Sequence, residues 1–347
     1  MLVMTAESTD DDVHVATVGA SYDGPLMWSG GSVRERRDDG PDRMASSSRF
    51  NLVHLAAAEM VRQAHLGARR ETPAPLHNPF APRHKQADAR DSTDWVWIPA
   101  GTAVVGSTDD EPDSLPEERP QHAISLPRFA IARTPVSIAE FRAFQHACAP
   151  RDADLITMAA PAAGDDRTPV TGVNWFDAIA YCQWLEDCLR TSTSLPEGYA
   201  VDLPSEPEWE RAARSDLHQA YPWGDTFDSS RANVRSSGIG TVVPSGSFSP
   251  GGDSPFGIQD MAGNVFEWTR SAWGHSRHNP DFAYPYDPTD GREYRGAHIN
   301  ARRVVRGGAY YYDDNCVRVA TRNVFMPWIR HPGGGFRVVL RRGNWPV

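Results

Sequence analysis

The stretch Gly257–Ser271, GIQDMAGNVFEWTRS, carries the strongest structural information in this sequence. Its Gly-Asn pair at 263–264 is typical of a tight turn. Just after the turn, Glu267 stands between two aromatic residues, Phe266 and Trp268. A carboxylate in such apolar company is expected to be partly buried, and it then needs a cation or several hydrogen-bond donors.

Asp260 precedes the same turn and supplies a second carboxylate. Two carboxylates with backbone carbonyls between them can form a cage for a hard cation. The alternative is a carboxylate that pairs with an arginine or accepts hydrogen bonds from backbone N–H groups. A cation bound in such a cage would hold the loops together rather than take part in chemistry.

The segments upstream differ in composition. Residues 1–46 are acidic, polar and rich in Gly and Ser, which predicts a disordered segment. Residues 47–70 have apolar positions at helical spacing and are interpreted as an amphipathic helix. Residues 71–94 form a Pro-rich linker. The main domain is therefore predicted at 95–341, with a tail at 342–347.

Three helices in this domain have a start signal of the capping-box type, in which a polar cap residue is followed three positions later by an acidic one. The caps are Ser137, Asn174 and Ser205. The second helix has a single apolar stripe. The stripe consists of Ala178, Cys182, Leu185 and Leu189.

The remaining segments favour strands and long loops. WVWIPAGTAVVGS, at 95–107, predicts a strand pair with a turn at Pro99–Gly101, and AISLPRFAIARTPV, at 123–136, predicts another pair. RVVRGG and GFRVVLRR near the C-terminus also favour strands. Few short helices, short strands and long loops predict an α+β domain.

Composition excludes several function classes. The net charge is −10 and Lys85 is the only lysine, which argues against a nucleic-acid partner. We interpret the excess of arginine over lysine as codon bias. The four cysteines form no CxxC pair and are expected to be free thiols. No signal peptide or long apolar run is apparent, so we expect a cytoplasmic protein with no membrane partner.

Nine segments, in the same order along the chain, resemble the formylglycine-generating-enzyme family, also called sulfatase-modifying factors. They are WIPAGTAVVGS, EERPQHAISLPRFAIARTPVSIAEF, PVTGVNWFDAIAYCQWL, DLPSEPEWERAAR, YPWGD, ANV, GIQDMAGNVFEWTRS, RVVRGGAY and GFRVVL. The resemblance covers roughly residues 95–341 and implies a C-type-lectin-like fold with long ordered loops.

The resemblance also implies one structural calcium ion. Its ligands would be the side chains of Asp260 and Glu267 and the carbonyls of Gly263 and Val265. A second calcium site of the family is matched only by the pair Asn233–Val234, because the loop that should return an acidic residue is missing. We therefore expect one calcium site.

The catalytic thiols of the family are not matched. In formylglycine-generating enzymes two cysteines that bind copper follow the Gly-Gly pair, which is Gly307–Gly308 here. This sequence continues GGAYYYDDNCVRVATRN, with Tyr312 at the first thiol position and Val317 or Asp314 at the second. Cys316 matches neither position, so a two-thiolate copper site is not expected.

Other members of the family are iron-dependent, but the His-rich motif of their separate helical domain is missing from this N-terminus. We interpret the histidines of the domain as scattered surface or core residues rather than as one metal site. They include His122, His275, His278, His298 and His331.

Two C-terminal runs, residues 310–316 and residues 324–331, have the residue types of binding surfaces. Alternatively, the tyrosines fill the core. Similar stretches form the ligand surfaces of the variable proteins of diversity-generating retroelements, which this region resembles. The candidate ligand-binding residues are Tyr310, Tyr311, Tyr312, Asp313, Asp314, Asn315, Cys316, Trp328, Arg330 and His331.

Two hypotheses for the function follow. The first is a binding or accessory module that presents this C-terminal pocket to a protein or a small-molecule ligand. The alternative is an oxygen-using oxidoreductase of the family that depends on copper or iron and acts on a thiol or peptide substrate.

Overall fold

The computed structural model describes residues 93–148, 165–295 and 300–343, all in one compact unit, Ala56–Val347. The predicted disordered segment 1–46, the predicted helix 47–70 and most of the linker 71–94 lie outside the described residues. His298 and residues 344–347 of the tail also lie outside them. None of the helices in the described part is both long enough and apolar enough to span a lipid bilayer.

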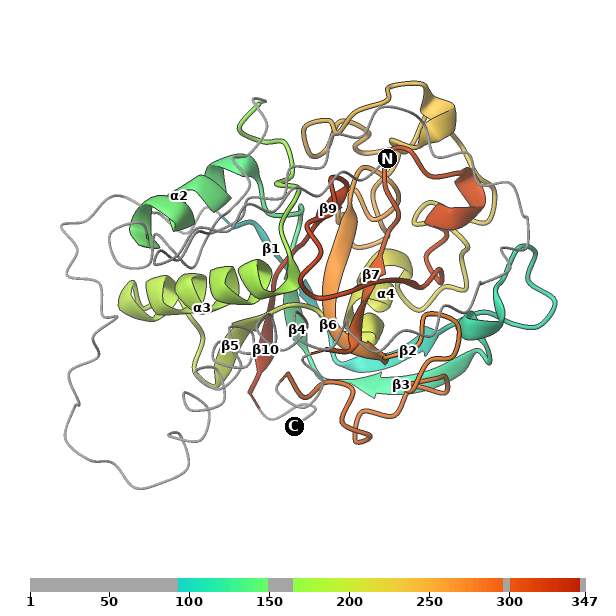
Figure 1. Cartoon of the computed structure of the whole chain (residues 1–347), viewed down its shortest axis with the longest axis horizontal. Coiled ribbons are helices and arrows are strands. Elements are labelled where there is room, and N and C mark those ends of the chain that lie inside the picture. The colour runs from blue at the N-terminus through green and yellow to red at the C-terminus, as the bar shows by residue number, and fades with distance from the viewer. Residues whose placement is uncertain (1–92, 149–164, 296–299, 344–347) are drawn as a thin grey trace, which may run out of the picture. The chain divides into compact units, whose positions relative to one another are not determined.

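Short strands form three small sheets in the described residues (Figure 1). The sheet orders are β1-β4-β10-β5, β2-β3 and β8-β7-β6-β9, and the β6–β9 pair is parallel. The strands are β1 (Trp95–Ile98), β2 (Gly101–Val105), β3 (His122–Leu126), β4 (Phe129–Ala132), β5 (Tyr199–Asp202), β6 (Phe266–Gly274), β7 (Arg302–Arg306), β8 (Asn323–Phe325), β9 (Gly334–Gly335) and β10 (Val339–Arg342).

The four N-terminal strands are present as predicted, but their pairing differs from the prediction. β1 pairs with β4 and β2 with β3, so neither 95–107 nor 123–136 is a hairpin by itself. The strands form one bent antiparallel ribbon, in which Ile98 lies opposite Phe129 and Gly101 opposite Leu126. Prolines at 99 and 127 provide no N–H for the ladder, so both sides of the ribbon bend at the same level.

The helices are α2 (Ile138–Cys148), α3 (Trp175–Thr191) and α4 (Glu206–Arg214), with short 3₁₀ turns η2 (Pro116–Glu118), η3 (Arg235–Ser237) and η4 (Asp314–Val317). All three predicted capping boxes are confirmed. The side-chain oxygens of Ser137, Asn174 and Ser205 accept hydrogen bonds from the backbone N–H three residues later, and the acidic side chain there accepts from the backbone N–H of the cap residue.

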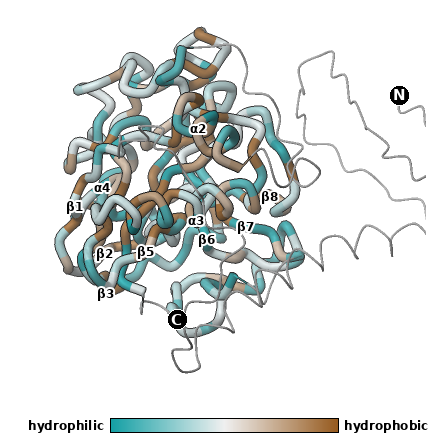
Figure 2. The backbone as a smooth tube through the Cα atoms, turned by 90° about the vertical axis from the view of Figure 1, so that its left-hand side faces the viewer, coloured by the Kyte–Doolittle hydropathy of each residue, from teal (hydrophilic) through white to brown (hydrophobic). Residues whose placement is uncertain are grey.

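The predicted stripe of α3 is buried and packs in the largest apolar cluster together with residues of α2, β6 and β10. Figure 2 shows hydrophobic, brown segments alternating with hydrophilic ones along the labelled elements. All nine residues of α4 and of β6 are buried. Both elements contain charged residues, so the interior of this domain contains many ion pairs.

Candidate functional site

The predicted calcium ligands lie around the expected turn. Asp260, Gly263 and Asn264 have positive φ angles of 57°, 77° and 63°. Glu267 is fully buried, and its Oε2 accepts hydrogen bonds from Trp209 Nε1 at 2.7 Å and Arg337 Nε at 2.5 Å. Its Oε1 accepts from Arg337 Nη2 at 2.6 Å.

The buried Glu267 is thus paired with a guanidinium, the alternative that the sequence left open. Asp260 is buried nearby and accepts a hydrogen bond from the Gly246 N–H at 3.0 Å. Burial raises the pKa of Asp260 to about 6, and the charge of Glu267 acts in the same direction. A metal ion at this turn would have to share Glu267 with Arg337, because both oxygens of the Glu267 carboxylate already accept hydrogen bonds. The calcium site stays a prediction.

The Gly-Gly pair after β7 forms the expected kink, since Gly307 and Gly308 have φ angles of 86° and 76°. A Cβ on Gly308 would lie 2.5 Å from Cγ1 of Val317. The kink directs the tyrosine run toward the segment that follows β8. The Tyr311 hydroxyl lies 3.1 Å from Nδ1 of His331, and their rings are stacked with centroids 6.0 Å apart.

The aromatic part of the predicted surface is half-buried. The rings of Tyr311 and Tyr312 contact the main core, and Tyr312 also packs edge-on against Phe266, with centroids 4.8 Å apart. Burial lowers the pKa of His331, which favours the neutral form of its imidazole. The tyrosines therefore fill part of the core, as one of the two interpretations expects, and their partial exposure leaves the ligand-binding role a prediction.

The polar part of the run lies in and around η4. Asp313 pairs with Arg235, with Oδ1 and Nη1 2.8 Å apart, and Asp314 accepts a hydrogen bond from the Ser236 hydroxyl at 2.7 Å. Cys316 is half-buried and its Sγ donates to Oδ1 of Asn315 at 3.3 Å. Burial, together with the charge of Asp313, raises the pKa of the Cys316 thiol.

The second predicted run is anchored to α3. Arg330 forms a two-pronged ion pair with Asp177, the acidic residue of the α3 capping box. Trp328 and Ile329 beside it are exposed, by 37% and 41%. Arg330 is therefore engaged inside the protein, whereas the exposed part of this run is apolar.

A surface cavity of about 660 Å³ lies beside η4. It is lined by Trp223, Gly224, Asp225, Thr226, Phe227, Asp228, Ser229, Arg231, Ser236 and Asp314. Among the predicted binding residues, Asp314 alone belongs to this lining. Its main wall is the stretch 223–229, which begins within YPWGD, a segment that in sequence terms indicated only the family resemblance. The aromatic and acidic composition of that loop was the signal that could have identified it.

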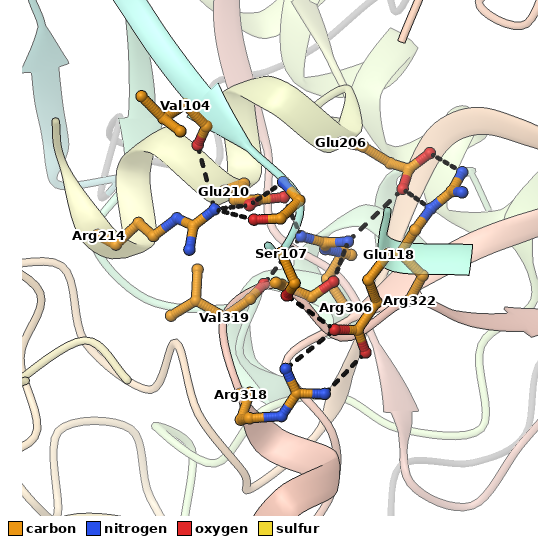
Figure 3. A network of polar contacts seen from close by, with 12 residues as sticks. Val104, Ser107, Glu118, Glu206, Glu210, Arg214, Arg306, Arg318, Val319 and Arg322 are labelled. Carbon is orange, nitrogen blue, oxygen red and sulfur yellow. Dashed lines mark hydrogen bonds and ion pairs between the residues drawn. The ribbon is translucent and has the colours of Figure 1, made fainter. Parts of the chain in front are cut away.

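A network of buried ion pairs supports this region (Figure 3). Arg318, directly after η4, donates to both oxygens of Glu118 at 2.9 and 2.8 Å. Arg322 forms a similar two-pronged pair with Glu206, at 2.6 and 2.8 Å. Guanidinium groups suit such pairs because their planar fork matches a carboxylate. The loop that contains η2 thereby holds η4, and with it one side of the cavity.

The histidines form no common site in the described residues. His122 uses both ring nitrogens within the protein: Nδ1 lies 2.9 Å from the Pro120 carbonyl and Nε2 accepts from the Tyr286 N–H at 2.8 Å. His275 pairs with Asp281 on an exposed loop, with Nδ1 and Oδ2 2.8 Å apart. No cluster of three or more His, Cys, Asp or Glu side chains within 93–148, 165–295 and 300–343 could hold a metal ion.

Comparison with known proteins identifies relatives over most of this domain. The protein-family model described as "Sulfatase-modifying factor enzyme 1-like domain" matches residues 81–342 of this chain. The formylglycine-generating enzyme of Thermomonospora curvata is 28% identical over 301 residues, which cover 70% of this chain and 91% of that enzyme. The hercynine oxygenase of Mycolicibacterium smegmatis is 29% identical over 275 residues, with 70% of this chain and 60% of that protein covered.

The "Serine/threonine-protein kinase pkn1" of Chlamydia pneumoniae is 26% identical over 284 residues, which cover 76% of this chain but only 41% of that protein. The chain thus spans less than two thirds of the length of this relative and of the hercynine oxygenase. Among solved structures, PvdO from Pseudomonas aeruginosa is 25% identical with a TM-score of 0.57, covering 78% of this chain and 100% of PvdO. These similarities confirm the predicted fold class, an α+β domain of the formylglycine-generating-enzyme, C-type-lectin-like type.

Proposed function

The chain belongs to the sulfatase-modifying-factor family, and on that premise we propose that it is a binding or accessory module rather than a formylglycine generator. Its ligand, a protein or a small molecule, would be bound by the surface around η4 and the exposed residues of the 324–331 run. The scaffold would serve to present this surface, and the buried ion pairs behind it would keep the surface rigid.

The observation that carries this proposal is the environment of Cys316. It provides the single thiol of the segment after Gly308, and burial together with the charge of Asp313 raises its pKa, which disfavours the thiolate form. The three remaining cysteines are on α2 and α3, where Cys182 is fully buried. A copper site of the family's type needs two thiolates, and copper prefers such soft ligands.

The alternative, an oxidoreductase that uses copper or iron, is favoured by the names of two relatives, a formylglycine-generating enzyme and a hercynine oxygenase. Both similarities extend over 70% of the chain. A fold of this kind can keep its scaffold while the chemistry of its site changes, so these similarities leave the activity open.

The test measures metal content and oxygen consumption on the purified full chain. A cysteine-containing peptide is supplied as substrate, with copper or ferrous iron added in separate reactions. We expect no oxygen consumption above that of the metal and peptide alone. Stoichiometric bound copper or iron, with turnover that Cys316→Ala abolishes and the matched Cys188→Ala variant on α3 keeps, would establish the oxidoreductase instead.

A further inference from the structure

The cavity beside η4 has a rigid aromatic wall. The ring of Trp223 stacks on Tyr221, with centroids 5.5 Å apart and planes at 11°, and Phe227 packs edge-on against Tyr221 at 5.4 Å. The indole Nε1 of Trp223 donates to the Thr226 carbonyl at 3.1 Å. Two backbone hydrogen bonds between Tyr221 and Gly224 close the turn. Rings held in this way lose little entropy when a ligand packs against them.

The cavity lining has an excess of negative charge. It contains three aspartates and one arginine, a formal charge of −2. Arg231 is already engaged, since its Nε lies 2.9 Å from Oδ2 of Asp228 and its Nη1 donates to the Gly251 carbonyl at 2.9 Å. In the part of the chain that the structure describes, the two remaining carboxylates, Asp225 and Asp314, accept hydrogen bonds from neutral donors, the Ala220 N–H at 3.3 Å and the Ser236 hydroxyl at 2.7 Å.

Neighbouring charges do not cancel this excess. Arg318, behind the cavity, is held by Glu118 and Glu111 and by the backbone carbonyl of Asp113. Arg235 is paired with Asp313. These two arginines are thus engaged within the protein, and neither forms an ion pair with Asp225 or Asp314 in the described residues.

We propose that this cavity binds an organic cation, an ammonium or guanidinium group on an apolar stem. The stem would lie against Trp223 and Phe227, whose ring faces attract cations, and the charged group would lie between Asp225 and Asp314. This inference rests on the proposed binding function and specifies the chemistry of the ligand. The same chemical group occurs in a lysine or arginine side chain of a partner and in a free polyamine.

The test is calorimetric titration of the full chain at low ionic strength with two probes, spermidine and a terminally blocked pentapeptide with one central lysine. Binding of either probe supports the proposal, and the probe that binds more tightly identifies the source of the cation. The same peptide with acetylated lysine keeps the stem without the charge and should bind at least tenfold more weakly. Affinity should also fall as salt is raised, because partly exposed charges are screened.

The variant Asp225→Asn/Asp314→Asn should weaken binding at least tenfold. The matched control Asp187→Asn/Glu197→Gln removes two exposed carboxylates that are not part of the lining and should leave the affinity unchanged. Trp223→Leu keeps an apolar side chain in the wall but removes the aromatic ring face, and it should weaken binding severalfold. The melting temperature of this variant shows whether it is still folded. Equal losses in the two double variants, or no binding of either probe at millimolar concentration, would refute the inference.

The oxygen-consumption assay on the same preparation reports on the proposed function separately. Absent cation binding together with absent turnover would overturn only the identification of the ligand. Metal-dependent turnover would instead overturn the binding-module proposal, whatever the cavity binds.

Discussion

Replacing Arg337 by methionine tests whether the buried pair with Glu267 holds the central turn together. The variant keeps an unbranched apolar stem but removes two of the three hydrogen bonds described for Glu267, leaving the one from Trp209. It also removes the donors to three backbone carbonyls, those of Ala132, Arg133 and Gln259. A carboxylate with no exposed surface would then have no paired cation.

Removing one partner of a buried ion pair costs roughly 3–5 kcal/mol. In a domain of this size each kcal/mol shifts the melting temperature by roughly 2–4 °C. We therefore expect Arg337→Met to lower the free energy of unfolding by about 3–5 kcal/mol and the melting temperature by about 6–20 °C. Urea and thermal unfolding followed by circular dichroism measure both quantities.

Two further variants make this prediction specific. Arg277→Met removes an exposed arginine and should change stability by no more than about 0.5 kcal/mol. Adding Glu267→Gln to Arg337→Met removes the unpaired charge, so the double variant should be more stable than the sum of the two single losses predicts, by about 1–3 kcal/mol. A loss below about 1 kcal/mol in Arg337→Met, or strictly additive losses, would show that the pair does not stabilise the turn.

Three other predictions concern charge, backbone and metal. Burial alone would raise the pKa of Asp202, but the surrounding arginines, Arg295 foremost, lower it to about 2, below its ordinary value of 3.8. The lowered pKa means about 2 kcal/mol of stability that is present above pH 4 and is lost as the pH falls toward 2. Unfolding at several pH values should therefore show the deficit of Asp202→Asn shrinking over this range, and a constant deficit would contradict it. Gly308→Ala combines a positive φ with a methyl 2.5 Å from a valine carbon and should cost roughly 2–4 kcal/mol in urea unfolding. Gly198→Ala, with a φ of 77° and open space around it, should cost only about 1 kcal/mol, and equal costs would exclude the steric contribution. If calcium binds the central turn, a free calcium concentration of about 100 times Kd should add about 2.7 kcal/mol to the free energy of unfolding of the unsubstituted protein. The same calcium concentration should not stabilise Asp260→Asn. Equal melting temperatures in EDTA and in calcium would mean that the arginine pair alone neutralises the turn.

The short-range part of the fold was predictable from the sequence. A capping box involves residues only three positions apart, so the starts of α2, α3 and α4 follow from local chemistry. The stripe of α3 follows from helical periodicity. The four N-terminal strands were also placed correctly, because a strand pattern is likewise a local signal. Nothing local showed which of these strands pair. Two prolines that look like turn signals instead bend one continuous ribbon.

The candidate site was predictable only in part. The residues after the Gly-Gly pair were identified from their types and from the absence of paired thiols. The sequence could not show that Asp313 turns toward Arg235, 78 positions away, or that Arg330 is occupied by Asp177, 153 positions away. It also did not distinguish YPWGD as the start of a cavity wall, because that wall exists only where η4 packs beside it.

The sequence by itself therefore determined the family, the fold class, the helix starts and the lack of a second thiol after Gly308, since all of these depend on residue types and short spacings. The tertiary structure alone determined the partner of each buried charge. Glu206 pairs with Arg322 and Glu118 with Arg318 across 116 and 200 positions. The sequence around a buried carboxylate does not show whether a guanidinium or a metal ion neutralises it. Only the tertiary packing shows which cation lies next to the carboxylate.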